Sequence, residues 1–316
     1  RGTVWRFITH GGFLYLFDFM HALRVPDPLQ LPHLPLFTHP DHEAFMFTGG
    51  QAAALLVHGF PGTALEMRPL GRELNAVGWT VSGLRLPGFG PELADLLKYD
   101  NQDWVMAILD AYHSLRSRGH TPLLLVAYSF GGALALQAAA QVPFTGLILI
   151  APFTWREPAW GKALVDFFRS LLPLSVYPFR HLPIDHPELV KQYQQYLPEI
   201  DLKDPDHQDE LRHFQFPLAV LDQLRAVGRE GVHAAQYVQT PTLLIHSPED
   251  PVVQAKSIET LQARLAGPVI KETVYGPHGL TMPQNPAYKD VAAKALSFAA
   301  QILQDLDDRS TLHGRR

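Results

Sequence analysis

One serine of this chain stands where the sequence favours nucleophilic chemistry. Ser129 lies in the segment Ala-Tyr-Ser-Phe-Gly-Gly, between an apolar run and a segment with helical spacing. A sharp strand-to-helix turn projects a serine hydroxyl above a sheet, and it needs small residues two positions to either side because the backbone approaches its neighbours closely. Ala127 and Gly131 meet that need, although glycine is more usual at the first position. An ordinary strand–glycine–helix connection is the alternative interpretation.

Two residues that could activate this serine follow apolar runs further along the chain. Asp250 comes shortly after the run that ends at His246. His278 comes shortly after the run that ends at Tyr275. Because ligands bind at the carboxyl ends of parallel strands, both side chains are expected at one edge of a sheet. There the histidine would take the serine proton as general base, and the aspartate would orient the histidine ring.

The order of the three residues along the chain supports this interpretation. Taken alone, Asp250 could be a loop-capping aspartate and His278 a surface histidine. The order serine, aspartate, histidine is that of the α/β-hydrolases and differs from two other serine-protease orders. Glu249 is the rival acid, but the residue directly before Pro-Val-Val is the usual position, which favours Asp250.

Backbone N–H donors for a developing oxyanion are expected from two places. Acyl transfer requires donors aimed at the negative charge of the tetrahedral intermediate. A His-Gly-Phe-Pro-Gly segment starts at His58, directly after an apolar run. Donors from such a loop and from the residue after the nucleophile would be Phe60 and Phe130. His58 itself is interpreted as a structural hydrogen-bonding residue rather than a base.

The elements that must position these residues alternate between strand and helix. The pattern predicts strands over 45–48, 52–57, 79–86, 123–127, 146–150, 242–246 and 269–275, and 52–57 is a continuous apolar run, as expected of a strand buried on both faces. Helical spacing predicts helices over 66–77, 102–116, 131–141, 257–265 and 286–306. This alternation predicts the α/β class, with a mostly parallel sheet covered by helices on both faces. The sheet domain is expected to consist of residues 41–151 and 236–308.

The alternation stops in residues 152–235, which are rich in proline, aromatic and acidic residues. Helical spacing continues there only over 163–172, 186–196 and 218–227. Because the segment starts at the carboxyl end of a strand, we expect a helical cap over or beside the site. The candidates to line a substrate pocket are Tyr128, Phe153, Trp155, Trp160 and Phe168.

The two ends of the chain are expected to lie outside these domains. Residues 1–40 are interpreted as an N-terminal apolar segment and a Pro-rich linker, and residues 26–40 hold too many prolines for helix or central strand. Residues 7–23 are apolar but too short to span a bilayer. They are expected to pack as a helix on the domain, with weak contact to a membrane or lipid surface as the alternative. Residues 309–316 are expected to form a tail.

Composition limits the possible function classes. The 316 residues carry a net charge of −5, and the chain has no cysteine, which excludes disulfides, thiolate metal sites and a cysteine nucleophile. Lysine and arginine form no concentrated basic face of the kind that binds nucleic acid. The 16 histidines show no close pair typical of a catalytic metal site. We therefore expect no metal, no cofactor and no nucleic-acid partner. We expect a cytoplasmic protein, and the oligomeric state stays open.

At these motifs the sequence resembles the carboxylesterase and monoacylglycerol-lipase branch of the α/β-hydrolase superfamily, and most of all the small bacterial carboxylesterases. The segment 55–63 is similar to their oxyanion segment, and 86–90 resembles their Pro-Gly-His-Gly loop with Phe89 in place of the usual histidine. The resemblance covers residues 50–150 and 235–305. It implies an α/β-hydrolase fold and hydrolysis of a small-molecule carboxylic ester, without a cofactor, beneath a helical cap.

The resemblance specifies the substrate only weakly, because this fold hosts many chemistries. Short- to medium-chain acyl esters or monoacylglycerols are the expected substrates. Thioesterase, amidase, carbon–carbon bond hydrolase and perhydrolase activities remain alternatives. A non-catalytic lipid- or ligand-binding protein of the same fold is the alternative from another class.

Overall fold

The computed structural model describes residues 31, 33–155, 175–176, 190, 194 and 196–313, the last few and 175–176 as backbone only. A seven-stranded sheet with the order β1-β3-β2-β4-β5-β8-β9 forms the centre of the described chain. Its strands are β1 (Phe45–Phe47), β2 (Ala53–Val57), β3 (Thr80–Gly83), β4 (Leu123–Tyr128), β5 (Gly146–Ile150), β8 (Thr242–His246) and β9 (Val269–Thr273). β1 runs antiparallel to β3, and the other neighbours pair in parallel. The predicted mostly parallel sheet is therefore confirmed.

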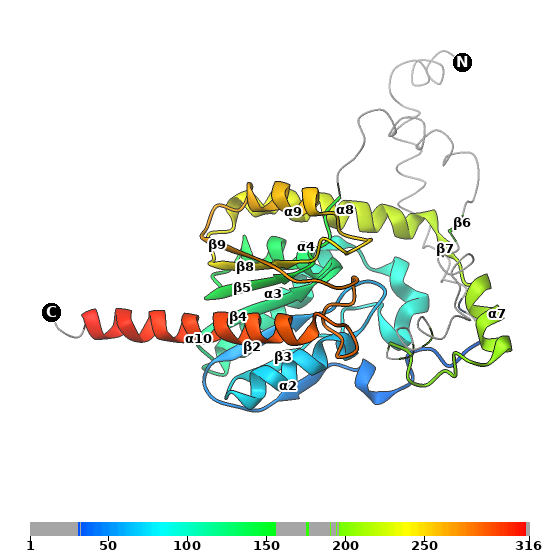
Figure 1. Cartoon of the computed structure of the whole chain (residues 1–316), viewed down its shortest axis with the longest axis horizontal. Helices are drawn as coiled ribbons and strands as arrows, with labels where there is room; N and C mark the ends of the chain where they lie inside the picture. Colours follow the sequence, from blue (N-terminus) through cyan, green and yellow to red (C-terminus); the bar gives the residue numbers. More distant parts are fainter. Residues whose placement is uncertain are drawn as a thin grey trace, which may run out of the picture.

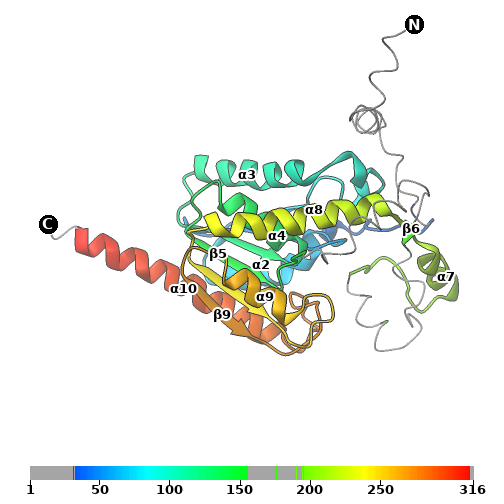
Figure 2. The ribbon, with the colours of Figure 1, turned by 90° about the horizontal axis from the view of Figure 1, so that it is seen from above.

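Helices cover both faces of this sheet, because its strands are apolar on both sides. Successive side chains of a strand point to opposite faces, so on β2 Leu55 enters one core cluster and Leu56 the other. The face with Leu56 is covered by α2 (Arg68–Ala76) and α10 (Tyr288–His313). The face with Leu55 is covered by α3 (Asn101–Ser117), α4 (Phe130–Ala139), α8 (Leu218–Ala234) and α9 (Ala255–Gln262). Figure 2 shows α3, α4 and α8 side by side.

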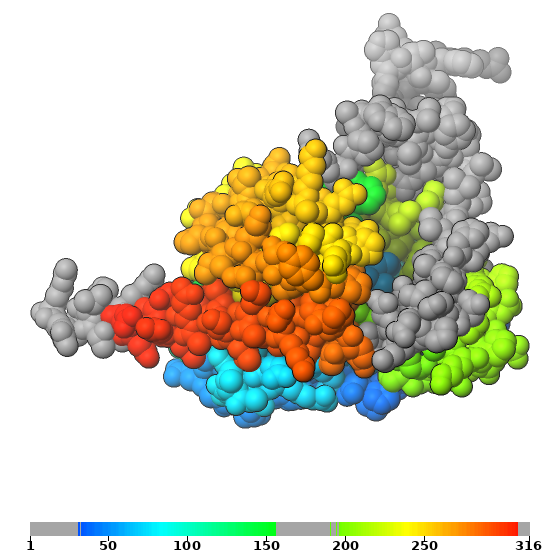
Figure 3. Space-filling view, viewed as in Figure 1, coloured from blue at the N-terminus to red at the C-terminus, as the bar shows by residue number. Residues whose placement is uncertain are grey.

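Shorter elements connect or extend this framework. The 3-10 helices are η1 (Pro40–His42), η2 (Ala64–Met67), η3 (Gly90–Lys98) and η4 (Ala235–Tyr237). Between β5 and α8 lie α7 (Pro205–His213) and a small antiparallel pair of β6 (Ser175–Val176) and β7 (Phe216–Pro217). α7 and the far end of α10 lie at opposite ends of the molecule (Figure 1). α10 reaches away from the block formed by the sheet and its helices (Figure 3), and it runs into residues 309–316, which were expected to be a tail.

The helix expected over 218–227 is longer and belongs to the layer on the sheet. α8 continues to Ala234 and packs closely on α4. At Gly231 an added Cβ would come within 2.6 Å of the carbonyl oxygen of Ala133, so only glycine permits this approach. The second half of the helix therefore covers the sheet, although residues up to 235 were assigned to the cap.

The expectation that residues 26–40 form a surface linker is wrong for two of its apolar residues. Leu34 is buried with Ile200 and Leu202, which follow much later in the chain. Phe37 is buried against the core on the α3 side of the sheet. The prolines exclude helix and central strand, but they do not prevent the side chains between them from packing.

Several sequence expectations lie outside the described residues. These are the apolar segment 7–23, the helix over 163–172, most of the helix over 186–196, and the side chains of Trp160 and Phe168. In the part of the chain that the structure describes, no helix has the length and apolar character needed to cross a membrane.

Candidate active site

Ser129 occupies a sharp turn between β4 and α4. Its backbone has φ 49° and ψ −116°, a region that L-residues rarely adopt. The turn is held from both sides, because the Ser129 N–H donates to the Ile150 carbonyl at 2.9 Å and the Ser129 carbonyl accepts from Phe153 N–H at 2.8 Å. The strained turn is thus fixed by its neighbours, as the predicted strand-to-helix elbow requires.

Glycines allow the loop after β2 to lie directly against this turn. A Cβ added to Gly131 would lie 2.4 Å from the carbonyl oxygen of His58. A Cβ added to Gly59 would lie 3.0 Å from the ring of Tyr128 and 3.2 Å from the Cβ of Ser129. The close approach brings the backbone around Phe60 to the serine.

The structure brings Ser129, His278 and Asp250 into one hydrogen-bonded line. The Nε2 atom of His278 lies 2.9 Å from Ser129 Oγ, and its Nδ1 atom lies 2.6 Å from Asp250 Oδ2. The other carboxylate oxygen of Asp250 accepts from the N–H groups of Val252 and Val253 at 2.7 and 3.0 Å. Glu249, the rival acid, is exposed. The aspartate therefore orients the ring so that Nε2 faces the serine hydroxyl.

Three side chains hold the loop that carries His278, one from β4, one from the residue after β8 and one from the connection that leads to α10. The hydroxyl of Tyr128 donates to the His278 carbonyl at 2.9 Å. Asn285 Nδ2 donates to the Pro277 carbonyl at 2.7 Å, and Ser247 Oγ donates to the Gly276 carbonyl at 2.7 Å. Burial raises the pKa of Tyr128 well above its usual value, so its hydroxyl remains a donor. Tyr128 was expected only as a pocket residue, and it also positions the histidine loop.

His58 joins the loops after β2 and β3. Its Nε2 accepts from the Leu86 N–H at 3.1 Å, and its Nδ1 lies 2.8 Å from the Gly59 carbonyl. Burial lowers the pKa of His58 to about 4, although the Gly59 hydrogen bond acts in the opposite direction. The neutral ring therefore holds two loops together, which agrees with the structural role expected for it.

Aromatic rings surround the two expected oxyanion donors. The rings of Phe60 and Phe130 have centroids 6.0 Å apart. Phe89, which replaces the histidine usual in similar sequences, packs on Phe130 at 5.9 Å and on Trp104 at 5.8 Å. Phe130 is the first residue of α4, so its N–H has no carbonyl partner within the helix. The rings of Phe89, Phe130 and Trp104 are buried and form an apolar cluster beside this free donor.

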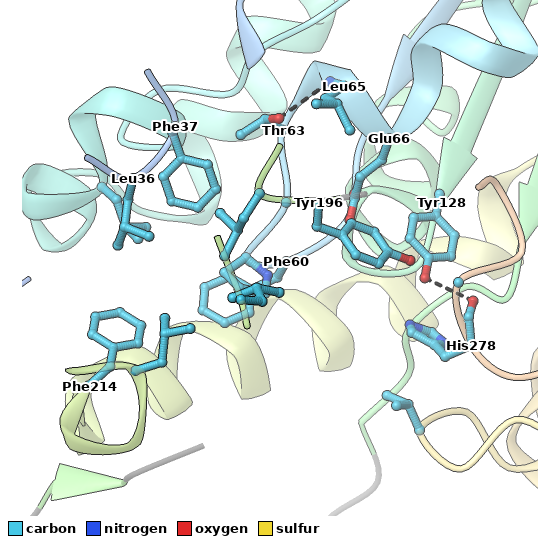
Figure 4. Close-up of a pocket in the computed structure, with 18 of the residues that line it drawn as sticks. Leu36, Phe37, Phe60, Thr63, Leu65, Glu66, Tyr128, Tyr196, Phe214 and His278 are labelled. Atoms are coloured by element: carbon cyan, nitrogen blue, oxygen red, sulfur yellow. Dashed lines mark hydrogen bonds between the residues drawn. The ribbon is translucent and has the colours of Figure 1, made fainter. Parts of the chain in front are cut away.

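A cavity of about 300 Å³ opens beside His278 (Figure 4). Its walls are mainly apolar, and its polar side chains include those of Glu66, Tyr128 and Tyr196. Of the expected pocket residues, Tyr128 lines it. Apolar and aromatic residues supply most of the remaining wall: Leu36, Phe37, Phe60, Leu65, Leu93, Val190, Leu197, Leu202, Leu211, Phe214 and Val252.

Two expected pocket residues lie elsewhere. Phe153 and Trp155 pack at Gly228 of α8, where an added Cβ would lie 2.8 Å from Trp155 and 2.9 Å from Phe153. The guanidinium of Arg225 stacks on the Trp155 ring at 5.5 Å. Neither ring lines the cavity beside His278, and their part in binding a substrate stays a prediction.

Sequence reasoning missed Glu66 and the walls contributed by residues 36–37 and 197–214. The apolar residues between the prolines of 31–37 were a usable signal, since isolated apolar side chains in a polar linker tend to pack. Glu66 carried no signal, because a glutamate near a helix start reads as a solvated residue. Within the described ranges, no group of His, Asp and Glu side chains is arranged to hold a metal ion.

Comparison with known proteins places this geometry in a family. A family model described as "Serine aminopeptidase, S33" matches residues 50–280. The chain is 35% identical to a carboxylesterase of Bacillus subtilis over 104 residues, which is 33% of this chain and 42% of that protein. It is 31% identical to a thermostable monoacylglycerol lipase of a Bacillus species over 214 residues, which is 67% of this chain and 75% of that protein.

Solved structures agree on the fold. A structure from work on LipS and LipT, two metagenome-derived lipolytic enzymes, superposes with a TM-score of 0.66 at 22% identity, covering 83% of this chain and 98% of that chain. The family match covers well over half of the chain, and the superposition shows the α/β-hydrolase fold independently. The chain therefore belongs to this family of serine hydrolases, as an α/β-hydrolase of the esterase and lipase kind.

Proposed function

We propose that the chain hydrolyses carboxylic esters through an acyl-enzyme, with Ser129 as nucleophile, His278 as general base and Asp250 as the residue that orients the base. The observation that carries the proposal is the line of hydrogen bonds from Ser129 Oγ through His278 to Asp250, at 2.9 and 2.6 Å, beside an apolar cavity. Nucleophile, base and orienting acid at such distances are the geometry of serine acyl transfer.

In the first step the oxygen of Ser129 attacks the ester carbonyl carbon, and Nε2 of His278 takes the serine proton. Asp250 stabilises the imidazolium that forms. The carbonyl oxygen becomes an oxyanion, which accepts hydrogen bonds from the N–H groups of Phe60 and Phe130. Because Phe130 begins α4, the positive end of the helix dipole also faces this charge.

In the second step the intermediate collapses, and the bond to the alcohol oxygen breaks. His278 gives its proton to the leaving alcohol, and the acyl group stays on Ser129. Water then attacks the acyl-enzyme while His278 takes its proton, and the acid leaves as Ser129 regains a proton from His278. The cycle balances without a cofactor.

The cavity supports short- to medium-chain acyl esters or monoacylglycerols as substrates. Its walls are apolar, and its volume of about 300 Å³ is at the small end of the range for ligand pockets. One of the similar proteins is a monoacylglycerol lipase. The part of residues 152–235 that precedes the second half of α8 is proposed to act as the cap, and wall residues such as Tyr196 and Leu202 come from that part. Weak lipid contact through residues 7–23 and a cytoplasmic location stay predictions.

The direct test is fluorophosphonate labelling together with a series of p-nitrophenyl esters from acetate to long acyl chains. The parent protein is expected to be labelled and to hydrolyse the esters, and folded Ser129→Ala is expected to do neither. Undiminished labelling of Ser129→Ala would remove the nucleophile assignment. If aminoacyl p-nitroanilides were hydrolysed faster than any ester, the proposed esterase activity would be wrong and the chain would be a peptidase.

A further inference from the structure

Glu66 is a buried carboxyl group at the oxyanion loop, and the mechanism above does not use it. It belongs to η2, directly after the loop that carries Phe60, and its exposed fraction is 6%. Its Oε2 atom accepts a hydrogen bond from the Gly59 N–H at 3.0 Å. A Cβ added to Gly62 would lie within 2.1–2.3 Å of its carboxyl atoms, so the group lies directly against that residue as well. One carboxyl therefore contacts the loop on both sides of Phe60.

The same carboxyl lines the cavity near the histidine. Figure 4 shows it beside the Tyr196 and Tyr128 side chains, at the end of the cavity that reaches His278. The electrostatic effect of Glu66 on Tyr128 agrees with this closeness. A change in the charge of Glu66 should therefore alter the electrostatic potential at the place where the ester carbonyl reacts.

Burial keeps Glu66 in its neutral form up to neutral pH. Burial raises its pKa to about 7, although the hydrogen bond from Gly59 acts in the opposite direction. In the preceding loop the His58 ring is neutral, because burial lowers its pKa to about 4, and it contacts the Gly59 carbonyl and the Leu86 N–H. From α2 the Arg68 guanidinium is engaged by Asp41 instead.

The other titratable groups around Glu66 come from the remaining elements at the cavity. Tyr128, at the end of β4, is neutral because burial raises its pKa. Tyr196 comes from the insertion, and His278 from the loop after β9. The electrostatic effect of Asp250 helps to raise the pKa of Tyr128, as does that of Glu66. A negative charge on Glu66 would therefore add to that of Asp250.

We propose that Glu66 is the positioning residue of the oxyanion loop, which in its neutral form holds Gly59 and Gly62 so that the Phe60 N–H faces the reacting carbonyl. Loss of its proton places a negative charge one residue away from that donor and opposes the developing oxyanion. At an effective dielectric constant of about 20, which also suits buried sites, repulsion between two charges several ångströms apart changes a rate on the order of 10- to 100-fold. The inference rests on the proposed function of the serine site.

The test is the pH dependence of ester hydrolysis by the parent, Glu66→Gln and Glu73→Gln. Glutamine keeps an oxygen that accepts from Gly59 N–H and cannot ionise. Glu73 is exposed on α2, so the same chemical change there serves as the matched control. For the parent, kcat/KM is expected to fall as Glu66 ionises, near pH 7 and above. Glu73→Gln should show the same decrease in kcat/KM as the parent.

Glu66→Gln is expected to lose the alkaline fall, so that it exceeds the parent on the order of 10- to 100-fold at alkaline pH and matches it within about threefold at acid pH. The difference should appear in kcat, with KM nearly unchanged. Superimposable profiles of the parent and Glu66→Gln would overturn the proposal. A difference confined to KM would overturn it too, because the carboxyl would then bind substrate.

A second measurement covers the case in which Glu66→Gln does not fold. Infrared titration of Ser129→Ala should show a protonated carboxyl band that disappears near pH 7, and its absence would overturn the proposal. Failure of the proposed function is distinguishable, because Ser129→Ala would then retain the ester hydrolysis of the parent. In that case the pH profile of Glu66→Gln no longer reports on an oxyanion formed at Ser129.

Discussion

His42 and Glu199 are joined by a buried hydrogen bond of 3.2 Å between His42 Nε2 and Glu199 Oε2. The other ring nitrogen of His42 lies 2.8 Å from the hydroxyl of Thr63, which is the last residue before η2. Glu199 lies in the segment between β5 and α8, whereas Thr63 ends the oxyanion loop. One histidine therefore ties that segment to the loop expected to supply an N–H donor.

The first prediction concerns this tie. Burial acts to raise the pKa of Glu199, but the hydrogen bond with His42, backbone hydrogen bonds and the electrostatic effect of His42 together outweigh it, and the pKa is lowered from its usual value of 4.5. A lowered carboxyl pKa contributes stability that is present above 4.5 and is lost as pH falls through the folded-state pKa. Glu199→Gln should therefore lower the free energy of unfolding by about 1–3 kcal/mol at pH 7. Urea unfolding should show this difference shrinking below pH 4.5, and a constant difference would contradict it.

The second prediction concerns the orienting acid. Asp250→Asn should keep the fold and lower kcat by about 10⁴, because the amide no longer holds the catalytic tautomer of His278. Glu249→Gln, one residue earlier and exposed, is the matched control and should change kcat by less than about threefold. Steady-state rates with one p-nitrophenyl ester decide the matter. A larger loss in Glu249→Gln would move the assignment by one residue.

The third prediction concerns Tyr128 and the histidine loop. Tyr128→Phe removes the hydrogen bond to the His278 carbonyl and should lower the free energy of unfolding by about 1 kcal/mol. It should also lower kcat, because the loop holds the base. The raised pKa keeps the Tyr128 hydroxyl protonated, so the loss should be equal at pH 7 and pH 10. An effect that vanishes at alkaline pH would show that the hydroxyl had already ionised.

The fourth prediction concerns acyl-chain length. Burying a methylene contributes about 0.8 kcal/mol, so kcat/KM should rise about fourfold for each methylene that the cavity encloses and should fall once the cavity is full. Phe214→Ala removes an aromatic ring from the wall and enlarges the cavity, so the acyl-chain length with the highest kcat/KM should increase. Trp155→Ala is the control, because Trp155 packs at Gly228 instead. An optimum that shifts in Trp155→Ala but not in Phe214→Ala would restore the pocket expected from sequence.

The sheet and the line of hydrogen bonds at its edge could be predicted because both depend on short-range patterns. Continuous apolar runs identify the strands β4 and β8, which are buried on both faces and precede Ser129 and Asp250. His278 follows the partly exposed edge strand β9. The carboxyl ends of parallel strands meet at one edge, so the three side chains converge without any knowledge of the loops.

The cavity wall could not be predicted, because it depends on which distant segments pack together. Phe153 and Trp155 were aromatic and near the serine in sequence, yet they pack at Gly228 of α8 and do not line the cavity. Phe37 was placed in a linker, yet it lines the cavity. For Glu66 the sequence shows a charged residue at a helix start, whereas burial, which no local pattern reveals, determines its behaviour.

α8 has a mechanical consequence for access to the cavity. It is one unbroken helix from Leu218 to Ala234, and its second half is locked on α4 by the close approach at Gly231. A helix of this kind is stiff, and sharp bends need a local cause such as proline. We therefore expect α8 not to move when a substrate enters the cavity. Because α4 begins at the residue after Ser129, α8 keeps its position relative to that serine as well.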